Sequence, residues 1–184
     1  MTPLPPLRCL RAFLRRGGVI AYPTESCFGF GCDPRNARAV GRLLRIKGRP
    51  RAKGLILIGS DASQFAPYLA PIPAETLRRL PEWWPGPVTL LLSRSRHCPR
   101  WLSGRHEKLA VRVTAHPEAV RLCKSLDMAL VSTSANRAGQ RPLKTAAACR
   151  RRFGRRILAL DGRIGGRKRP STILDPDSGG VLRA

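Results

Sequence analysis

The chain has 184 residues, and its 35 Lys and Arg outnumber its 11 Asp and Glu, which gives a net charge of +24. Hydrophobic residues make up 42% of the chain and lie in short blocks along it, which argues against a disordered chain and against a membrane span. A chain of this length suits one hydrophobic core, so we expect residues 1–184 to form a single domain.

The first predicted element is an amphipathic helix near the N-terminus, built on Leu7, Leu10, Phe13 and Leu14 at helical spacing. Arginines interrupt this apolar stretch, whereas a signal peptide needs an uninterrupted apolar centre. We therefore expect a cytoplasmic protein with no membrane partner.

The apolar runs that follow have the length and composition of buried strands. They cover residues 18–22, 54–59, 88–92, 109–113, 128–132 and 157–160. Helical patterns lie between most of them, with start signals at Asp33-Pro34, His116-Pro117 and Thr145. This alternation predicts an α/β layer fold whose sheet is partly parallel.

The segments between these elements are small, polar or glycine-rich. They comprise residues 23–34, 49–54, 83–87, 132–142 and 161–171, and most of them adjoin the end of a predicted strand. Because open α/β sheets bind ligands beyond the ends of their strands, we expect these loops to converge on one site.

Residues 45–54, RIKGRPRAKG, contain five cations and no acid. In an extended chain, which Pro50 favours for the residue before it, Lys47, Arg49, Arg51 and Lys53 would share one face. Neighbours on that face would lie roughly 7 Å apart and repel by about 2 kcal/mol at an effective dielectric constant of ~20. In a cleft such a face needs an anion, but the run alone is more typical of a solvated surface.

Two short motifs offer hydrogen-bonding groups without charge. VSTSAN follows a predicted strand and supplies Ser132, Ser134 and Asn136, and PTES supplies Thr24 and Ser26. Such groups suit a phosphate, a ribose or a carboxylate, although either motif alone is as simply explained by a turn or a helix cap.

Standard catalytic motifs are missing from the sequence, which has neither a GxxxxGK[ST] loop nor a GxSxG elbow. Acids are sparse, so neither a catalytic carboxylate pair nor a protein-built metal site is expected. Any chemistry should depend on positioning and on cations that stabilise developing negative charge.

Six segments, taken in order, carry a resemblance to a known family. They are AYPTESCFGFGCDP, LLRIKGRPRAKGLILI, WPGPVTLLL, LAVRVTAHP, LVSTSANRAGQRP and RPSTILD. From about residue 18 to 183 the chain resembles the YrdC/TsaC family of L-threonylcarbamoyl-AMP synthases, in its short bacterial form. The resemblance implies a YrdC-like single domain, a twisted, mixed and partly parallel sheet flanked by helices, with a basic concave ligand-binding surface.

The resemblance also implies a reaction. L-threonine, bicarbonate or CO₂, and ATP would give threonylcarbamoyl-AMP and pyrophosphate, with Mg²⁺ brought by the nucleotide. A tRNA-threonylcarbamoyl transferase complex would then move the group onto the adenosine beside the anticodon of tRNA.

The family's residues can be carried over position by position. The implied ATP-binding residues are Lys47, Arg49, Lys53, Ser134, Asn136 and Arg183, with Lys47 and Arg49 also catalytic. The implied threonine- and bicarbonate-binding residues are Thr24, Ser26, Arg112, Ser132 and Ser171. Arg112 could pair with the substrate carboxylate through two parallel hydrogen bonds.

Two other hypotheses start from the charge. The same basic surface could bind double-stranded RNA or tRNA directly without catalysis, and ribosome association would rest on charge alone. An enzyme needs Ser134, Asn136 and Arg112, whereas a protein that contacts only RNA phosphates could lose them cheaply. The arginine excess is also compatible with codon bias or general solubility.

Overall fold

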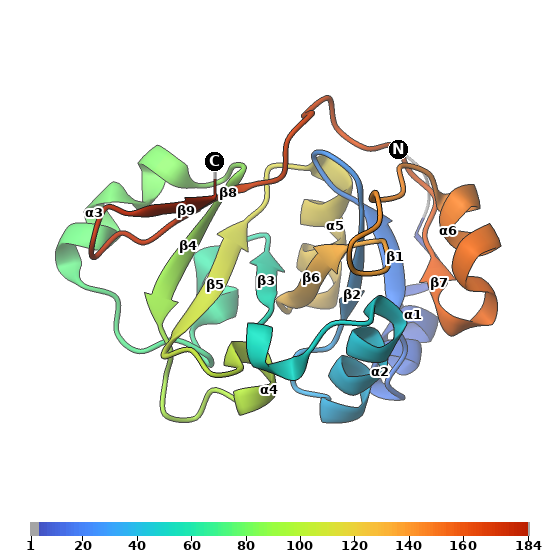
Figure 1. Cartoon of the computed structure of the whole chain (residues 1–184), viewed down its shortest axis with the longest axis horizontal. Helices are drawn as coiled ribbons and strands as arrows, with labels where there is room; N and C mark the ends of the chain where they lie inside the picture. Colours follow the sequence, from blue (N-terminus) through green and yellow to red (C-terminus); the bar gives the residue numbers. More distant parts are fainter. Residues whose placement is uncertain (1–3, 184) are drawn as a thin grey trace.

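The computed structural model describes residues 4–183, which fold around one mixed sheet (Figure 1). The sheet has nine strands in the order β7-β1-β2-β6-β3-β5-β4-β8-β9. Three neighbouring pairs, β1 with β7, β3 with β5 and β4 with β8, run parallel, and the others run antiparallel. The predicted α/β class with a partly parallel sheet is therefore confirmed.

The elements have the following bounds. The strands are β1 Ile20–Pro23, β2 Phe28–Cys32, β3 Ile56–Gly59, β4 Val88–Ser93, β5 Lys108–Val113, β6 Leu130–Ser134, β7 Leu158–Ala159, β8 Thr172–Leu174 and β9 Val181–Arg183. The α-helices are α1 Leu7–Arg15, α2 Ala37–Lys47, α3 Ala74–Trp83, α4 Arg100–Ser103, α5 Pro117–Leu126 and α6 Ala146–Phe153. Short 3-10 helices are η1 Arg51–Lys53, η2 Ala62–Phe65 and η3 Gly154–Arg156.

Two hydrophobic clusters hold the helices to the sheet. The apolar faces of α1 and α5 bury Leu10, Leu14 and Leu122 against β1, β3 and β6. The larger cluster takes residues of α2 and α6, including Leu43 and Phe153, together with the alternate positions of the same strands. Burying a Leu or Phe side chain contributes roughly 1.5–3 kcal/mol each, so these faces fix where the helices lie.

Local capping chemistry explains two of the three predicted helix starts. Pro117 stands at the first turn of α5, and the Thr145 side chain accepts a hydrogen bond from the Ala148 N–H at the start of α6. The start predicted at Asp33-Pro34 is wrong, because α2 begins at Ala37 and is capped by Asn36. The Asp33 carboxylate is already engaged by the Arg35 N–H and guanidinium, so it closes its own turn instead.

The basic run does not adopt the extended conformation in which its four cations would share one face. Lys47 is the last residue of α2, and Gly48 then turns the chain with φ of 66°, in the left-handed region that favours glycine. Arg51 to Lys53 form η1. The four cations therefore do not share one face of a strand.

Several segments that were expected to be loops carry strand or helix. Residues 23–34 contain β2, residues 132–142 begin with the end of β6, and α3, β8 and β9 were not anticipated. No helix within residues 4–183 combines the length and apolar character needed to span a bilayer.

Candidate active site

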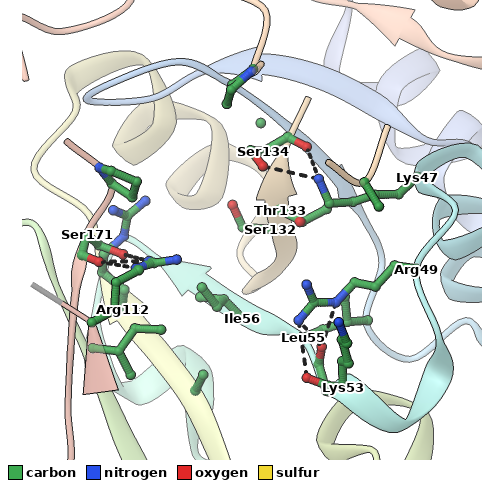
Figure 2. A pocket seen from close by; sticks show the side chains of 18 of the residues that line it. Lys47, Arg49, Lys53, Leu55, Ile56, Arg112, Ser132, Thr133, Ser134 and Ser171 are labelled. Carbon is green, nitrogen blue, oxygen red and sulfur yellow. Dashed lines mark hydrogen bonds between the residues drawn. The ribbon is translucent and has the colours of Figure 1, made fainter. Parts of the chain in front are cut away.

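A large cavity lies over the middle of the sheet, with a volume of about 1240 Å³. This is above the roughly 300–1,000 Å³ of an ordinary ligand pocket, so it has room for two substrates together. All the site residues expected from the sequence line it, namely Thr24, Ser26, Lys47, Arg49, Lys53, Arg112, Ser132, Ser134, Asn136, Ser171 and Arg183. Figure 2 shows Lys47 and Arg49 on one side of the cavity and Arg112 and Ser171 on the other.

The floor of the cavity is a row of residues in register across four strands. Across β6, β3, β5 and β4 this row consists of Ser132, Ile56, Ala110 and Leu91. Beside it, Gly29 of β2 pairs with Ser134 and brings no side chain into the space. The floor is therefore mostly apolar, and the polar groups stand around its edges.

Lys47 reaches the cavity from the end of α2. Its Nζ donates to the backbone O of Ser134 at 2.8 Å and to Ser134 Oγ at 3.1 Å (Figure 2). It also donates to Asn136 O at 3.3 Å and to Asn136 Oδ1 at 2.7 Å. Burial, and then the nearby Arg49 charge, lowers the pKa of Lys47 to about 8. The ammonium thus ties α2 to the end of β6 while it brings positive charge to the cavity wall.

Arg49 organises the loop that follows. Its Nε and Nη2 donate to the Gly54 carbonyl at 3.3 and 3.1 Å, and Nη2 also donates to the Lys53 carbonyl at 3.2 Å. Gly104 lets the chain approach this turn, since it has φ of 62° and a Cβ there would lie 2.7 Å from the Gly54 nitrogen. The loop that follows Arg49 therefore folds back onto the Arg49 guanidinium and holds it at the cavity wall.

Arg112 of β5 is held from behind by Glu25. Its Nη2 lies 3.3 Å from Glu25 Oε2, and Thr114 Oγ1 donates to Glu25 Oε1 at 2.6 Å. Burial alone would raise the pKa of Glu25, but the Arg112 guanidinium and the Thr114 hydroxyl bring it below its ordinary value. The Nε of Arg112 is buried and has no hydrogen-bond partner within residues 4–183, so the protein leaves part of the donor capacity of this guanidinium unsatisfied.

Ser171 and Arg183 form the wall beside Arg112. The guanidinium of Arg183 donates to the Ser171 carbonyl through Nε at 2.9 Å and Nη2 at 2.7 Å, and Nη2 also contacts Ser171 Oγ at 3.0 Å. Thr89 Oγ1 lies 2.9 Å from the same hydroxyl. Burial, and then the charges of Arg112 and Arg49, lowers the pKa of Arg183. Like charges that converge in this way favour an anion between them.

The hydroxyls near Arg112 are fixed by their neighbours. Tyr22 OH donates to Ser132 Oγ at 2.8 Å, and Thr24 Oγ1 donates to the Cys27 carbonyl at 2.7 Å. Burial raises the pKa of Tyr22 above its ordinary value, so its proton stays in place as a donor to Ser132. Ser26 lines the cavity close by, with its Oγ 3.9 Å from Cys27 Sγ.

Positive charge dominates the cavity lining. Among the described residues that line it, ten are Lys or Arg and one, Glu107, is an acid. Within residues 4–183, no group of three or more His, Cys, Asp or Glu side chains is arranged to hold a metal ion. The lining therefore suits ligands with several negative charges.

Three residues that shape the site are not among those predicted from the sequence. Glu25 belongs to the quoted PTES motif and could have been noticed as an acid in a chain that has few of them. Tyr22 ends an otherwise apolar strand, which is a weak signal for a buried hydroxyl. Thr89 lies within an apolar run, and nothing in the sequence indicates that it faces Ser171.

The chain is similar to known proteins along nearly all of its length. The Sua5_yciO_yrdC family model, described as "Telomere recombination", matches residues 12–184. A threonylcarbamoyl-AMP synthase of Methylobacillus flagellatus is 57% identical over 176 residues, which is 96% of this chain and 98% of that protein. One from Chromobacterium violaceum is 58% identical over 173 residues, or 94% and 90% of the two chains.

Solved structures give the same result. Sua5 of P. abyssi complexed with L-threonine has a TM-score of 0.84 and 31% identity over 93% of this chain, which spans about half of that protein (51%). YciO of E. coli has a TM-score of 0.82 at 26% identity, covering 99% of this chain and 91% of that one. The similarity in sequence and in fold to both proteins covers nearly all of the present chain.

Proposed function

The chain belongs to the Sua5/YciO/YrdC family, and we propose that it is an L-threonylcarbamoyl-AMP synthase whose active site is the basic cavity. The observation that carries the proposal is the convergence of Lys47, Arg49, Arg112 and Arg183 on one cavity large enough for ATP and an amino acid. The relatives at 57% and 58% identity carry that enzyme name, and the P. abyssi Sua5 structure holds L-threonine.

The chemistry joins three substrates. The threonine amine and CO₂, in equilibrium with bicarbonate, form a carbamate, whose oxygen attacks the α-phosphorus of ATP. The bond from that phosphorus to the bridging oxygen of the β-phosphate breaks, and pyrophosphate leaves with its electron pair. Mg²⁺ arrives with ATP and neutralises part of the phosphate charge.

In this proposal ATP binds on one side of the cavity and threonine binds on the other. On the ATP side, Lys47 and Arg49 stabilise the charge that grows on the leaving pyrophosphate, and the other nucleotide-binding groups are Lys53, Ser134, Asn136 and Arg183. On the amino-acid side, Arg112 pairs with the threonine carboxylate. The hydroxyls available to threonine and bicarbonate there belong to Thr24, Ser26, Ser132 and Ser171.

The burial of these groups favours catalysis over simple RNA binding. Lys47 is 5% exposed, Arg112 8%, Ser132 6% and Asn136 8%, so a duplex backbone resting on the surface would not reach them. They suit small ligands that enter the cavity. We propose that the product passes to a tRNA-threonylcarbamoyl transferase complex in the cytoplasm, and direct contact with tRNA through the surrounding cations is compatible with this.

The test is a reaction with purified protein, L-threonine, bicarbonate, Mg²⁺ and ATP labelled at the α-phosphate. We expect pyrophosphate and a labelled adenylate, both dependent on threonine and on bicarbonate. The proposal would be refuted if pyrophosphate release did not depend on threonine, or if no pyrophosphate were released at any substrate concentration. An assay with serine in place of threonine measures how far the side-chain methyl group contributes to selection.

A further inference from the structure

Sites that bind an amino acid as its zwitterion usually offer a carboxylate to the ammonium, and this cavity offers none that is free. Glu107, the one acid among the described lining residues, has a 75% exposed side chain and pairs with Arg94 at 2.7 Å and Arg100 at 3.6 Å. Glu25 is not among the described residues that line the cavity, and its 13% exposed side chain lies against Arg112 and Thr114. Neither carboxylate is placed to receive a substrate ammonium.

Neutral oxygen acceptors around the cavity are largely occupied too. The carbonyls of Ser134 and Asn136 accept from Lys47, that of Gly54 from Arg49, and that of Ser171 from Arg183. An ammonium brings three donors and needs an acceptor for each. The protein's own cations therefore lie against these oxygens, and a substrate ammonium that used them would lie beside a cation of the protein.

Three backbone carbonyls in and directly after the PTES segment also accept hydrogen bonds from the protein. The Thr24 carbonyl accepts from the Gly165 N–H, and the Glu25 carbonyl accepts from the Arg167 N–H. The Cys27 carbonyl accepts from both the N–H and the hydroxyl of Thr24. The remaining hydroxyls are neutral groups, which can bond to an amine but cannot neutralise a charge.

We propose that the cavity binds threonine with its amino group unprotonated, as the carboxylate anion or as its carbamate, and rejects the zwitterion. This inference rests on the proposed function and deepens it. An ammonium would share the cavity with Lys47, Arg112 and Arg183 and would find no free carboxylate among the described lining residues, whereas a neutral amine avoids that repulsion and needs only a hydroxyl partner.

The chemical consequence is that the site needs no basic residue to start the reaction. The amino acid loses its proton to bulk water before it binds. The nitrogen lone pair then attacks the CO₂ carbon, the N–C bond forms, one C=O pair moves onto oxygen, and a nitrogen proton leaves to solvent. The carbamate that results has gained a negative charge, which the same cations stabilise.

The protein's own titrations act in the opposite direction. The ionisable groups that line or adjoin the cavity are Glu25, Cys27, Lys47, Arg49, Lys53, Arg105, His106, Glu107, Lys108, Arg112, Arg141, Lys144, Lys168 and Arg183. As pH rises through neutrality, any of these cations that loses a proton weakens the binding of an anion. Burial raises the pKa of the Cys27 thiol, which therefore stays neutral in that range. A gain in threonine affinity with pH must then come from the ligand.

The experiment measures the dissociation constant of labelled L-threonine by equilibrium dialysis in CO₂-free buffer from about pH 5 to about pH 7, below the pKa of an α-amino group, which is roughly 7.7–8.0. We expect affinity to rise about tenfold for each pH unit, because the unprotonated fraction rises by that factor. The control ligand is the hydroxy acid in which a hydroxyl replaces the amino group, and its affinity should stay constant or fall. Threonine affinity that is flat, or that parallels the control, would overturn the inference.

Two variants test the acids directly. Glu107→Gln should leave both the threonine affinity and its pH slope unchanged, and loss of affinity near neutral pH would show that this carboxylate receives an ammonium. Glu25→Gln, which disturbs Arg112, should weaken threonine and the hydroxy acid by the same factor, and a loss confined to threonine would contradict the proposal. If threonine-dependent pyrophosphate release persists while binding is flat with pH, the inference fails and the proposed function stands. Absence of both threonine binding and threonine-dependent pyrophosphate release removes both.

Discussion

Replacing Lys47 by Met tests whether one ammonium both stabilises the fold and serves the reaction. Met keeps the length of the apolar stem but removes the charge and the donors that hold Ser134 and Asn136 at 2.7 to 3.3 Å. Hydrogen bonds to a charged group contribute about 1.5–3 kcal/mol each, and three protons serve four acceptors here. Burying the charge opposes part of this gain, so we expect a net loss of about 2–4 kcal/mol in the free energy of unfolding.

A loss of that size leaves the protein folded at low temperature, because domains of this kind have about 5–15 kcal/mol of stability. The melting temperature should fall by roughly 4–16 °C, and it can be followed by circular dichroism. Threonine-dependent pyrophosphate release, assayed below the melting temperature of the variant, should fall about a hundredfold or more.

The matched control is Lys53→Met. The Lys53 side chain lines the same cavity from an exposed position, and no hydrogen bond from its Nζ is found within residues 4–183. This control should lose less than about 0.5 kcal/mol of stability while its KM for ATP rises. If Lys47→Met unfolds like the wild type, the four contacts do not stabilise the fold; if it turns over like the wild type, Lys47 is not catalytic.

The remaining predictions address pH, the ATP side and the surface. Because the pKa of Lys47 is lowered to about 8, turnover at saturating threonine should fall as pH rises through that value, and Lys47→Arg should move the fall to higher pH. Arg183→Lys loses the paired hydrogen bonds from Nε and Nη2 to the Ser171 carbonyl. It should raise the KM for ATP about tenfold at similar stability. Gly104→Ala places a Cβ against a backbone nitrogen at φ of 62°, so urea unfolding should show a loss of about 2–4 kcal/mol. Arg151→Glu, on the exposed face of α6, should leave synthase activity within about twofold and weaken only any salt-dependent RNA binding.

Local patterns in the sequence predict those parts of the fold that local chemistry determines. The runs at 88–92 and 109–113 became β4 and β5 almost residue for residue, and the caps at Pro117 and Thr145 lie where they were expected. The start of α2 was misplaced because Asp33 and Asn36 are both good caps, and only the Arg35 contact decides between them. Where two residues could each cap a helix, side-chain contacts decide between them, and the capping preferences of single residues do not include those contacts.

Strand β2 shows a different limit. Its sequence FGFGC has two glycines, which disfavour strands, yet all five residues are buried in the middle of the sheet. Gly31 is required there because a Cβ would lie 2.7 Å from a ring carbon of Tyr22 and 3.0 Å from the Val131 carbonyl. The reason for the glycine is a tertiary contact, so propensity could not have found it.

The site residues were predicted from the family resemblance and not from local patterns, because their contacts are also tertiary. The basic run alone favoured a solvated surface, and the structure shows that its members differ, with Lys47 buried and Arg51 exposed. Nothing in residues 45–54 indicates that the ammonium of Lys47 would meet Ser134, which is 87 positions away. Charge composition predicts the kind of ligand, but the partners of each charge come from the fold.

The way the cations are held bears on how the site works. Lys47, Arg49 and Arg183 each rest on backbone carbonyls, so their positions are fixed by the main chain before any substrate arrives. Fixed charges need little reorganisation when negative charge develops, and this is where preorganised sites gain their rate. The same contacts place the protein's cations beside the oxygens that could have accepted from a substrate cation. A site built to stabilise a leaving pyrophosphate therefore also selects the unprotonated amine, and one set of hydrogen bonds accounts for both properties.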